Sequence, residues 1–267
     1  MLTREMVYNL YIKQNLSMAQ VARQCGVCAV TLWRQLKKWN IHKITRYKVN
    51  HESFSSYSPQ STYWAGLLAS DGNVSDDNRI TISLKVTDRE HLRLFCNFLK
   101  TPIDRIKTII GGCAKTKHAI VRMTSLQMST DLHNLFEVVP RKSLCLLPPK
   151  QIPKQFLNHF VRGYMDGDGC ISWDNKAKSA VVTFTSGSRV FLAWIKNVIK
   201  SHVPEARNPS VNKTKNSRAY SLRFGGKQAF YILGWVYQDC NGIALKRKQT
   251  RYKRFLVAYR HKMERSR

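Results

Sequence analysis

Two short segments of the chain each end in an aspartate that is followed by glycine: WAGLLASDGNVS at residues 64–75 and VRGYMDGDGCIS at residues 161–172. Aligned, they are identical at four positions, which are Gly66/Gly163, Asp71/Asp168, Gly72/Gly169 and Ser75/Ser172. The two aspartates are 97 positions apart (168 − 71). A doubled aspartate on a doubled helix predicts one metal site, built across a pseudo-two-fold axis.

The glycines of the two motifs explain how the aspartates could meet. Gly66 and Gly163 have no side chain, so two helices can lie close together side by side and bring their ends into contact. Two neighbouring carboxylates repel each other unless a proton or a cation lies between them. A hard divalent cation with oxygen ligands supplies that compensation, and Mg²⁺ is typical because it binds through one or two carboxylates and keeps waters.

The charge of the chain indicates its partner. Lysine and arginine number 45 against 16 acidic residues, a formal charge of +29. Self-repulsion of this size destabilises a compact chain unless a polyanion neutralises it. A solvated basic surface, or a ribosomal or membrane-surface protein, could share this composition, but scattered charge inside a well-patterned globular sequence favours nucleic acid. No apolar stretch approaches a membrane span. We therefore expect nucleic acid as the partner and a phosphodiester as the substrate.

The cysteines indicate the compartment. They number seven, an odd count without framework spacing, and several lie in apolar runs such as LFCNFL around Cys96. This pattern predicts reduced, buried thiols in an intracellular protein, located in a bacterial cytoplasm, a phage-infected host or an organelle. Cys25 and Cys28 form a lone C-x-x-C without a second pair at zinc spacing, which argues against a zinc site.

Residues 1–45 are predicted to form three short helices. Ser17 suits the N-cap of the second helix, Gly26 allows a tight turn because glycine accepts positive φ, and the third helix runs from Cys28 to Trp39. This segment resembles a helix-turn-helix DNA-binding module, in which the third helix lies in the major groove. The alternative is a small helical bundle that serves only as an interaction domain.

The exposed side of that third helix supplies the expected DNA contacts. The base-facing candidates are Ala29, Val30, Trp33 and Arg34. Lys37 and Lys38 follow as phosphate contacts. Residues 46–60 lose hydrophobic periodicity and gather Ser, Asn and Pro, so they are predicted to be a linker.

From residue 61 the chain repeats one order of elements. After the first motif helix come an alternating strand Arg79–Val86, a helix opened by a capping box at Thr87 and running through Leu99, a strand Ala119–Thr124 and a helix Leu126–Phe136. The second unit repeats this with a helix Phe160–Asp168, a strand Val181–Thr185, a helix Val190–Lys200, a strand Tyr220–Phe224 and a helix Ala229–Gln238. The predicted repeats are residues 61–148 and 149–262.

Basic residues recur at similar offsets in the two units. Arg122 and Arg223 are 101 positions apart (223 − 122), and Lys142 and Lys248 are 106 apart (248 − 142). Because these offsets lie close to the spacing of the two aspartates, an internal duplication explains them better than chance.

The paired motifs resemble the signatures of the LAGLIDADG homing endonucleases in their single-chain, two-repeat form. The resemblance covers about residues 61–260, and its most specific part is FVRGYMDGDGCIS. It implies an α+β fold, in which tandem αββαββα repeats form a pseudo-two-fold saddle of two antiparallel sheets over DNA, here preceded by the small all-α helix-turn-helix domain. It also implies a monomer that binds double-stranded DNA.

The resemblance also implies roles for individual residues. The metal ligand of the family is the eighth motif position, which is Asp71 and Asp168 here, whereas Asp166 at the sixth position has Ala69 as its counterpart and is not assigned to metal. Lys142 and Lys248 are expected to line a water-filled pocket beside the scissile phosphates and to steady developing charge. Residues expected to contact DNA on the strands are Thr81, Ser83, Arg122 and Arg223, with Lys85 and Thr185 at matching strand positions as holders of water.

The function that these residues favour is site-specific, double-strand DNA cleavage at a long recognition site, dependent on Mg²⁺ with Mn²⁺ as a substitute, as in intron homing. An RNA-binding intron maturase on the same scaffold is one alternative. A non-cleaving transcription regulator is another, since a bacterial sporulation-regulator family joins this scaffold to a helix-turn-helix, although it places that module after the scaffold. The presence of both aspartates and both lysines favours the enzyme.

Overall fold

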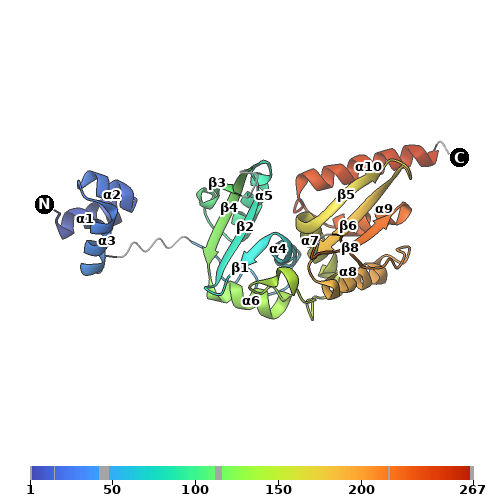
Figure 1. Ribbon diagram of the computed structural model, residues 1–267, viewed down its shortest axis with the longest axis horizontal. Helices are drawn as coiled ribbons and strands as arrows, with labels where there is room; N and C mark the ends of the chain where they lie inside the picture. Colours follow the sequence, from blue (N-terminus) through green and yellow to red (C-terminus); the bar gives the residue numbers. More distant parts are fainter. Residues whose placement is uncertain (1, 15, 42–47, 112–115, 216, 265–267) are drawn as a thin grey trace. The chain divides into compact units, whose positions relative to one another are not determined.

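The chain divides into two compact units, residues 1–47 and residues 48–267 (Figure 1). A computed structural model describes residues 2–14, 16–41, 48–111, 116–215 and 217–264, with side chains through residue 260. The smaller unit precedes the first motif, and the larger unit carries both motifs. In the described residues, no helix is both long enough and apolar enough to cross a membrane.

The smaller unit is a bundle of short helices. It consists of α1 (Arg4–Tyr8), a π-helical turn (Asn9–Lys13), α2 (Met18–Gln24) and α3 (Ala29–Lys38). Ser17 is the N-cap of α2, as predicted, and it forms a capping box with Gln20. Gly26 has φ of +62° in the turn between α2 and α3, the conformation that favours glycine. The bundle has its own core, formed by Val7, Val21, Ala22, Leu32, Leu36 and Ile41.

The larger unit contains two repeats of one topology, which confirms the predicted α+β class. The first repeat consists of α4 (Pro59–Ser70), β1 (Gly72–Val74), β2 (Arg79–Lys85), α5 (Arg89–Phe98), β3 (Lys107–Gly111), β4 (Thr116–Thr124) and α6 (Leu126–Phe136). The second consists of α7 (Leu157–Asp168), β5 (Gly169–Asp174), β6 (Ser179–Ser186), α8 (Arg189–His202), β7 (Asn212–Lys213), β8 (Tyr220–Gly225) and α9 (Lys227–Tyr237). Each sheet is antiparallel, in the orders β1-β2-β4-β3 and β5-β6-β8-β7.

The helices α4 and α7 lie side by side between the two sheets (Figure 1). A Cβ at Gly66 would stand 2.2 Å from the carbonyl oxygen of Phe160, so only glycine permits this approach. The prediction that the motif glycines allow close helix packing is therefore confirmed. Both helices are buried along most of their length, and a single hydrophobic core runs through the two repeats.

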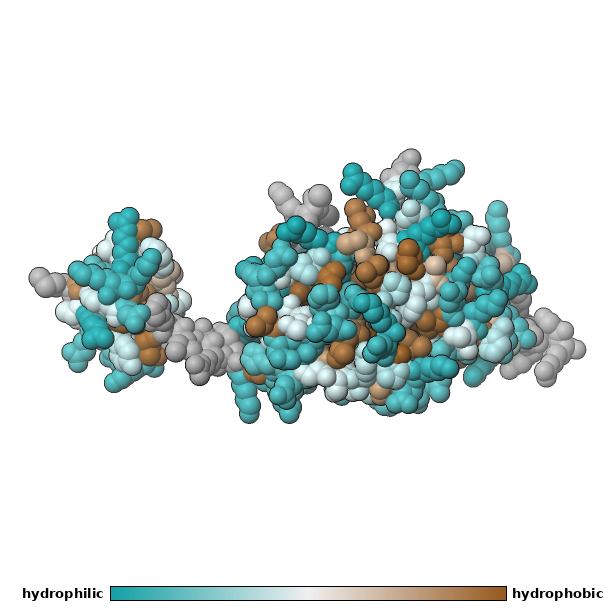
Figure 2. All heavy atoms as spheres, turned by 90° about the horizontal axis from the view of Figure 1, so that it is seen from below, coloured by the Kyte–Doolittle hydropathy of each residue, from teal (hydrophilic) through white to brown (hydrophobic). Residues whose placement is uncertain are grey.

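A last helix, α10 (Lys246–Glu264), follows the second repeat and packs on β5, β6 and α9. Its inner face is aromatic, with Phe255 against Trp173, Tyr259 against Phe230 and Tyr252 stacked on Tyr237. The face seen in Figure 2 is mostly hydrophilic, as expected for a chain with a net charge of +29, with hydrophobic side chains scattered over the middle of the larger unit.

Four details of the sequence predictions are corrected. The part of the predicted linker from residue 48 belongs to the folded first repeat, since Phe54 is fully buried and the Tyr57 hydroxyl donates to the Leu135 carbonyl; residues 46–47 lie outside the described residues. Val86 is exposed because β2 ends one residue earlier. Asp88, the N-cap of α5, makes no capping hydrogen bond, so the capping box is absent there. Of the six described cysteines, Cys96 alone is buried, so the prediction of buried thiols is wrong for the others.

Candidate active site

The two motif aspartates occupy the ends of the central helix pair. Asp71 is the C-cap residue of α4, and Asp168 is the last residue of α7. A Cβ at Gly167 would stand 1.9 Å from Ser70 Oγ and 3.2 Å from the Asp71 carboxyl carbon, so the two helix ends touch at this point. Both aspartates are exposed although the helices behind them are buried. The structure thus brings together the two residues that the sequence predicted to meet.

The environment of these carboxylates disfavours two negative charges. Partial loss of water and the charge of Asp71 raise the pKa of Asp168 to about 6, against the opposing effect of Lys142 and Lys248. The pKa of Asp71 is also raised, chiefly by loss of water, and the largest opposing effect comes from the charge of Lys248. Two neighbouring carboxylates that repel each other are suited to bind a hard divalent cation, which prefers oxygen ligands.

Few side chains are available as metal ligands at this site. Among the described residues no group of three or more His, Cys, Asp or Glu side chains could hold a metal ion. Asp71 and Asp168 would therefore share such a cation with backbone carbonyls, waters or a phosphate. This fits Mg²⁺, which keeps several waters and commonly binds through one or two carboxylates and substrate phosphates.

The two lysines share one contact at the ends of these helices. Lys142 Nζ donates to the Gly72 carbonyl at 2.6 Å, and Lys248 Nζ donates to the Gly169 carbonyl at 2.6 Å. Both side chains are buried. Burial lowers the pKa of Lys248 to about 8 and also lowers that of Lys142, where the two aspartates act in the opposite direction. This carbonyl-binding role is one that sequence reasoning missed.

The strands present polar residues in matched positions. Thr81 pairs with Arg122 across β2 and β4, and Thr183 pairs with Arg223 across β6 and β8. Thr81 and Ser83 are half-buried, whereas Lys85, Arg122 and Arg223 are exposed. Sequence reasoning missed Thr183, because its equivalence to Thr81 follows from strand pairing rather than from hydrophobic pattern.

The predicted match of Lys85 with Thr185 is wrong. Gly72 pairs with Ile82 and the equivalent Gly169 pairs with Phe184. Counting one residue onward from each partner makes Ser83, rather than Lys85, the counterpart of Thr185. The two repeats therefore carry a hydroxyl at this position.

Comparison with known proteins identifies the second repeat. The model of a LAGLIDADG-like domain matches residues 155–229. Residues 155–229 are a LAGLIDADG-like domain. It contains Asp168, Thr185 and Arg223, and the first repeat shows the same order of elements in the structure.

Solved structures resemble the chain at low sequence identity, and no curated protein sequence matches it. The N-terminal LAGLIDADG domain of DUF199/WhiA is 14% identical with a TM-score of 0.43, covering 70% of this chain and 88% of that one. The meganuclease I-AabMI bound to uncleaved DNA is 12% identical with a TM-score of 0.41, covering 77% and 97%. The homing endonuclease I-WcaI bound to its DNA recognition sequence is 9% identical with a TM-score of 0.48, covering 75% and 90%.

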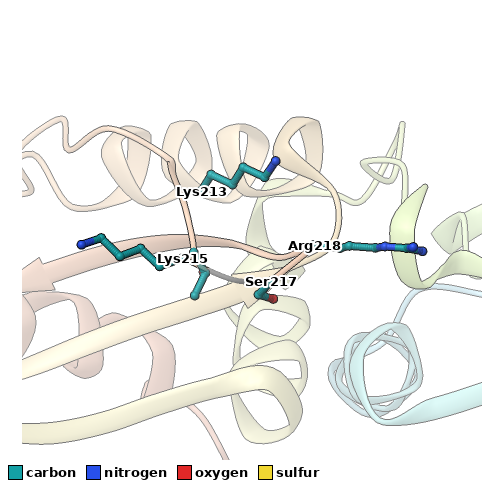
Figure 3. A pocket seen from close by; sticks show the side chains of 5 residues that line it. Lys213, Lys215, Ser217 and Arg218 are labelled. Atoms are coloured by element: carbon teal, nitrogen blue, oxygen red, sulfur yellow. The ribbon is translucent and has the colours of Figure 1, made fainter.

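A basic hairpin of the LAGLIDADG-like domain was missed by sequence reasoning. Lys213, Thr214, Lys215, Ser217 and Arg218 line a hollow around the connection between β7 and β8 (Figure 3). The available signal was the run KTKNSR, which lies between two segments with hydrophobic periodicity. Basic residues at the tip of a two-stranded ribbon are suited to contact phosphates.

Outside the LAGLIDADG-like domain, the predicted DNA contacts of the smaller unit are accessible. Arg34, Lys37 and Lys38 are exposed on α3, together with Ala29. Val30 and Trp33 are also exposed, at 57% and 51%. The Lys37 ammonium lies 5.4 Å from the centre of the Trp33 ring, so the two side chains form one exposed surface.

Proposed function

We propose that the protein is a site-specific endonuclease that hydrolyses both strands of double-stranded DNA at a long recognition site. The observation that carries this proposal is the meeting of Asp71 and Asp168 at the exposed ends of α4 and α7, on a chain with a formal charge of +29. The match to a LAGLIDADG-like domain and the presence of DNA complexes among the similar structures fit a protein that acts on DNA.

Asp71 and Asp168 would hold Mg²⁺, with Mn²⁺ as a substitute. When bound, the metal supplies an activated water as nucleophile and stabilises the oxygen that leaves phosphorus. Because both carboxylates come from one chain, the protein is proposed to act as a monomer. Lys142 and Lys248 keep the aspartate-bearing helix ends in place, and their positive charges lower the pKa of both carboxylates against the effect of burial.

The sheets would read the DNA sequence. Thr81, Ser83, Lys85 and Arg122 from the first sheet and Thr185 and Arg223 from the second lie on strands whose other face is in the core. Hydroxyl and guanidinium groups are suited to base edges and phosphates in the major groove. Arg34, Lys37 and Lys38 of the smaller unit would bind flanking DNA in the same way.

Incubation with the DNA that flanks its own gene tests this proposal. Defined double-strand cuts in Mg²⁺, absent in Ca²⁺ or with Asp168→Asn, would support it. Tight DNA binding without cutting in either Mg²⁺ or Mn²⁺ would replace it with a non-cleaving DNA-binding role, and preference for intron RNA would favour a maturase.

A further inference from the structure

A buried polar cluster lies on one side of the central helix pair. Asp166 of α7 is fully buried, and its Oδ2 accepts hydrogen bonds from the Tyr63 hydroxyl at 2.8 Å and from the Leu245 backbone N–H at 2.7 Å. The Tyr63 hydroxyl also lies 2.6 Å from His91 Nε2. The carboxylate therefore connects α4 of the first repeat with α7 and with the start of α10.

The start of α10 is joined to α7 in both directions. Asp166 accepts from Leu245, immediately before the helix begins, where a hydrogen-bond acceptor is needed because the first N–H groups of a helix have no partner inside it. Three residues further, Lys248 Nζ donates to the carbonyls of Met165, Asp166 and Gly167, at 2.6, 2.7 and 3.0 Å. A carboxylate thus caps one helix while an ammonium caps the other.

The other side of the pseudo-two-fold axis lacks this cluster. By motif alignment Ala69 replaces Asp166 and Phe160 replaces Tyr63. From the starts of α5 and α8, Phe191 replaces His91, and its ring centroid lies 6.4 Å from that of Phe160. Among the described residues, no carboxylate accepts a hydrogen bond from the backbone around Lys142. Two equivalent lysines are therefore held by different means.

We propose that Asp166 is a positioning residue for one of the two strand cuts: by fixing the start of α10 it holds the Lys248 ammonium at the Asp168 end of α7. This inference rests on the proposed endonuclease function. Since the two strands of DNA are themselves related by a two-fold axis, each half of the site faces one strand. Loss of the Asp166 carboxylate should impair the Lys248 half and spare the Lys142 half.

Strand-resolved cleavage tests the proposal. The assay uses enzyme in excess over a duplex that is labelled on either strand. Asp166→Ala should slow the cut of one strand by about tenfold or more, because an electrostatic contact is partly lost. The rate of the other cut should stay near that of the wild type. A nicked intermediate should accumulate, while the Kd for DNA stays unchanged. Asp166→Asn keeps an oxygen acceptor and should restore balanced cutting.

A matched control separates positioning from general destabilisation. Asp131 of α6 is also largely buried and accepts two hydrogen bonds, from Ser55 at 2.6 Å and Gln127 at 2.9 Å. Asp131→Ala should lower the free energy of unfolding without slowing the cut of one DNA strand more than the cut of the other. If Asp166→Ala does not fold, Asp166→Val fills more of the space and still lacks the acceptor. Equal slowing of both cuts by the folded Asp166 variant would overturn the proposal.

Hydrogen exchange provides a second readout that needs neither metal nor DNA. Asp166→Ala should increase exchange in peptides covering residues 243–250 and leave peptides covering residues 139–146 unchanged. Unchanged exchange at 243–250 refutes the inference whether or not the protein cuts DNA. If the wild-type protein does not cut DNA but Asp166→Ala shows the expected increase in exchange, the proposed function is refuted. The contact between Asp166 and Leu245 then stands as a structural one.

Discussion

Gly163 and Tyr63 are in backbone contact across the central helix pair: a Cβ on the glycine would stand 2.0 Å from the carbonyl oxygen of the tyrosine. With Gly66 opposite Phe160, this contact sets the spacing of α4 and α7, and through it the meeting of Asp71 and Asp168.

Gly163→Ala should destabilise the larger unit by about 1–3 kcal/mol or more, because a backbone carbonyl cannot move aside without separating the helices. Urea unfolding of the purified variant measures this. Gly234→Ala is the control, since its Cβ would meet only the Tyr252 hydroxyl at 3.8 Å, and in helix α9 alanine should be neutral or stabilising. Equal stability of the two variants would contradict the close packing.

Asp71→Asn and Asp168→Asn should each abolish double-strand cleavage while leaving DNA binding intact or slightly tighter, because a negative charge near phosphate is removed. Cleavage of labelled duplex and an affinity titration in Ca²⁺ measure the two effects. Asp104→Asn, at an exposed site of the first repeat, should cut like wild type. Full activity of either motif variant at saturating Mg²⁺ would show that these two aspartates do not form the proposed metal site.

Lys142→Ala and Lys248→Ala should each slow cleavage by a factor on the order of 10², with little change in DNA affinity. Each should also lose about 1–3 kcal/mol of stability, because buried carbonyls are left without a donor. Lys248→Ala should lose more, because its ammonium lies within hydrogen-bond distance of four carbonyls and that of Lys142 donates to one. Cleavage is measured at a temperature where the variants are folded, with Lys253→Ala on the exposed face of α10 as control.

His91→Phe should make stability less sensitive to acid. Burial lowers the pKa of His91 to about 4 from an ordinary 6.5, so the unfolded chain takes up a proton before the folded one. The stability that this residue contributes is complete above pH 6.5 and is lost as the pH falls toward 4, by up to about 3 kcal/mol.

Urea unfolding at pH 7 and pH 4.5 tests the His91 prediction. Wild type should lose more stability between the two values than His91→Phe, which installs the residue found at the equivalent Phe191. Parallel losses in the two proteins would show that His91 takes up its proton in the folded state as readily as in the unfolded one.

Removal of residues 1–47 should leave the larger unit folded, because the two units have separate cores. Cleavage at saturating protein should persist, while affinity falls, the footprint shortens at one end and the salt dependence of binding flattens. Arg34→Ala should reproduce part of the loss when the flanking bases are present. An identical footprint and salt slope in the truncated protein would show that this unit does not touch the target.

The prediction of strands succeeded where burial is regular. β2 and β4 are central in their sheet, so one face of each packs on the core and the alternation in Arg79–Lys85 is visible in the sequence. β1, β3 and β7 lie at sheet edges and are short or exposed. Edge strands of this kind form because the adjacent strand supplies hydrogen-bond partners. The local sequence pattern does not reveal which segment that adjacent strand is.

The duplicated order of elements, the helix pair and the meeting of its two aspartates could be predicted from the residues alone, because glycines, alternation and repeat spacing are local properties. Three features follow only from the folded structure: what holds Lys248, why Thr185 matches Ser83 and which groups Asp166 contacts. The contacts of Asp166 and Lys248 join segments about 80 residues apart, such as Asp166 with Leu245, whereas the match of Thr185 with Ser83 follows from strand pairing. The geometry of such pairs is set by packing of the whole unit, which no single segment encodes.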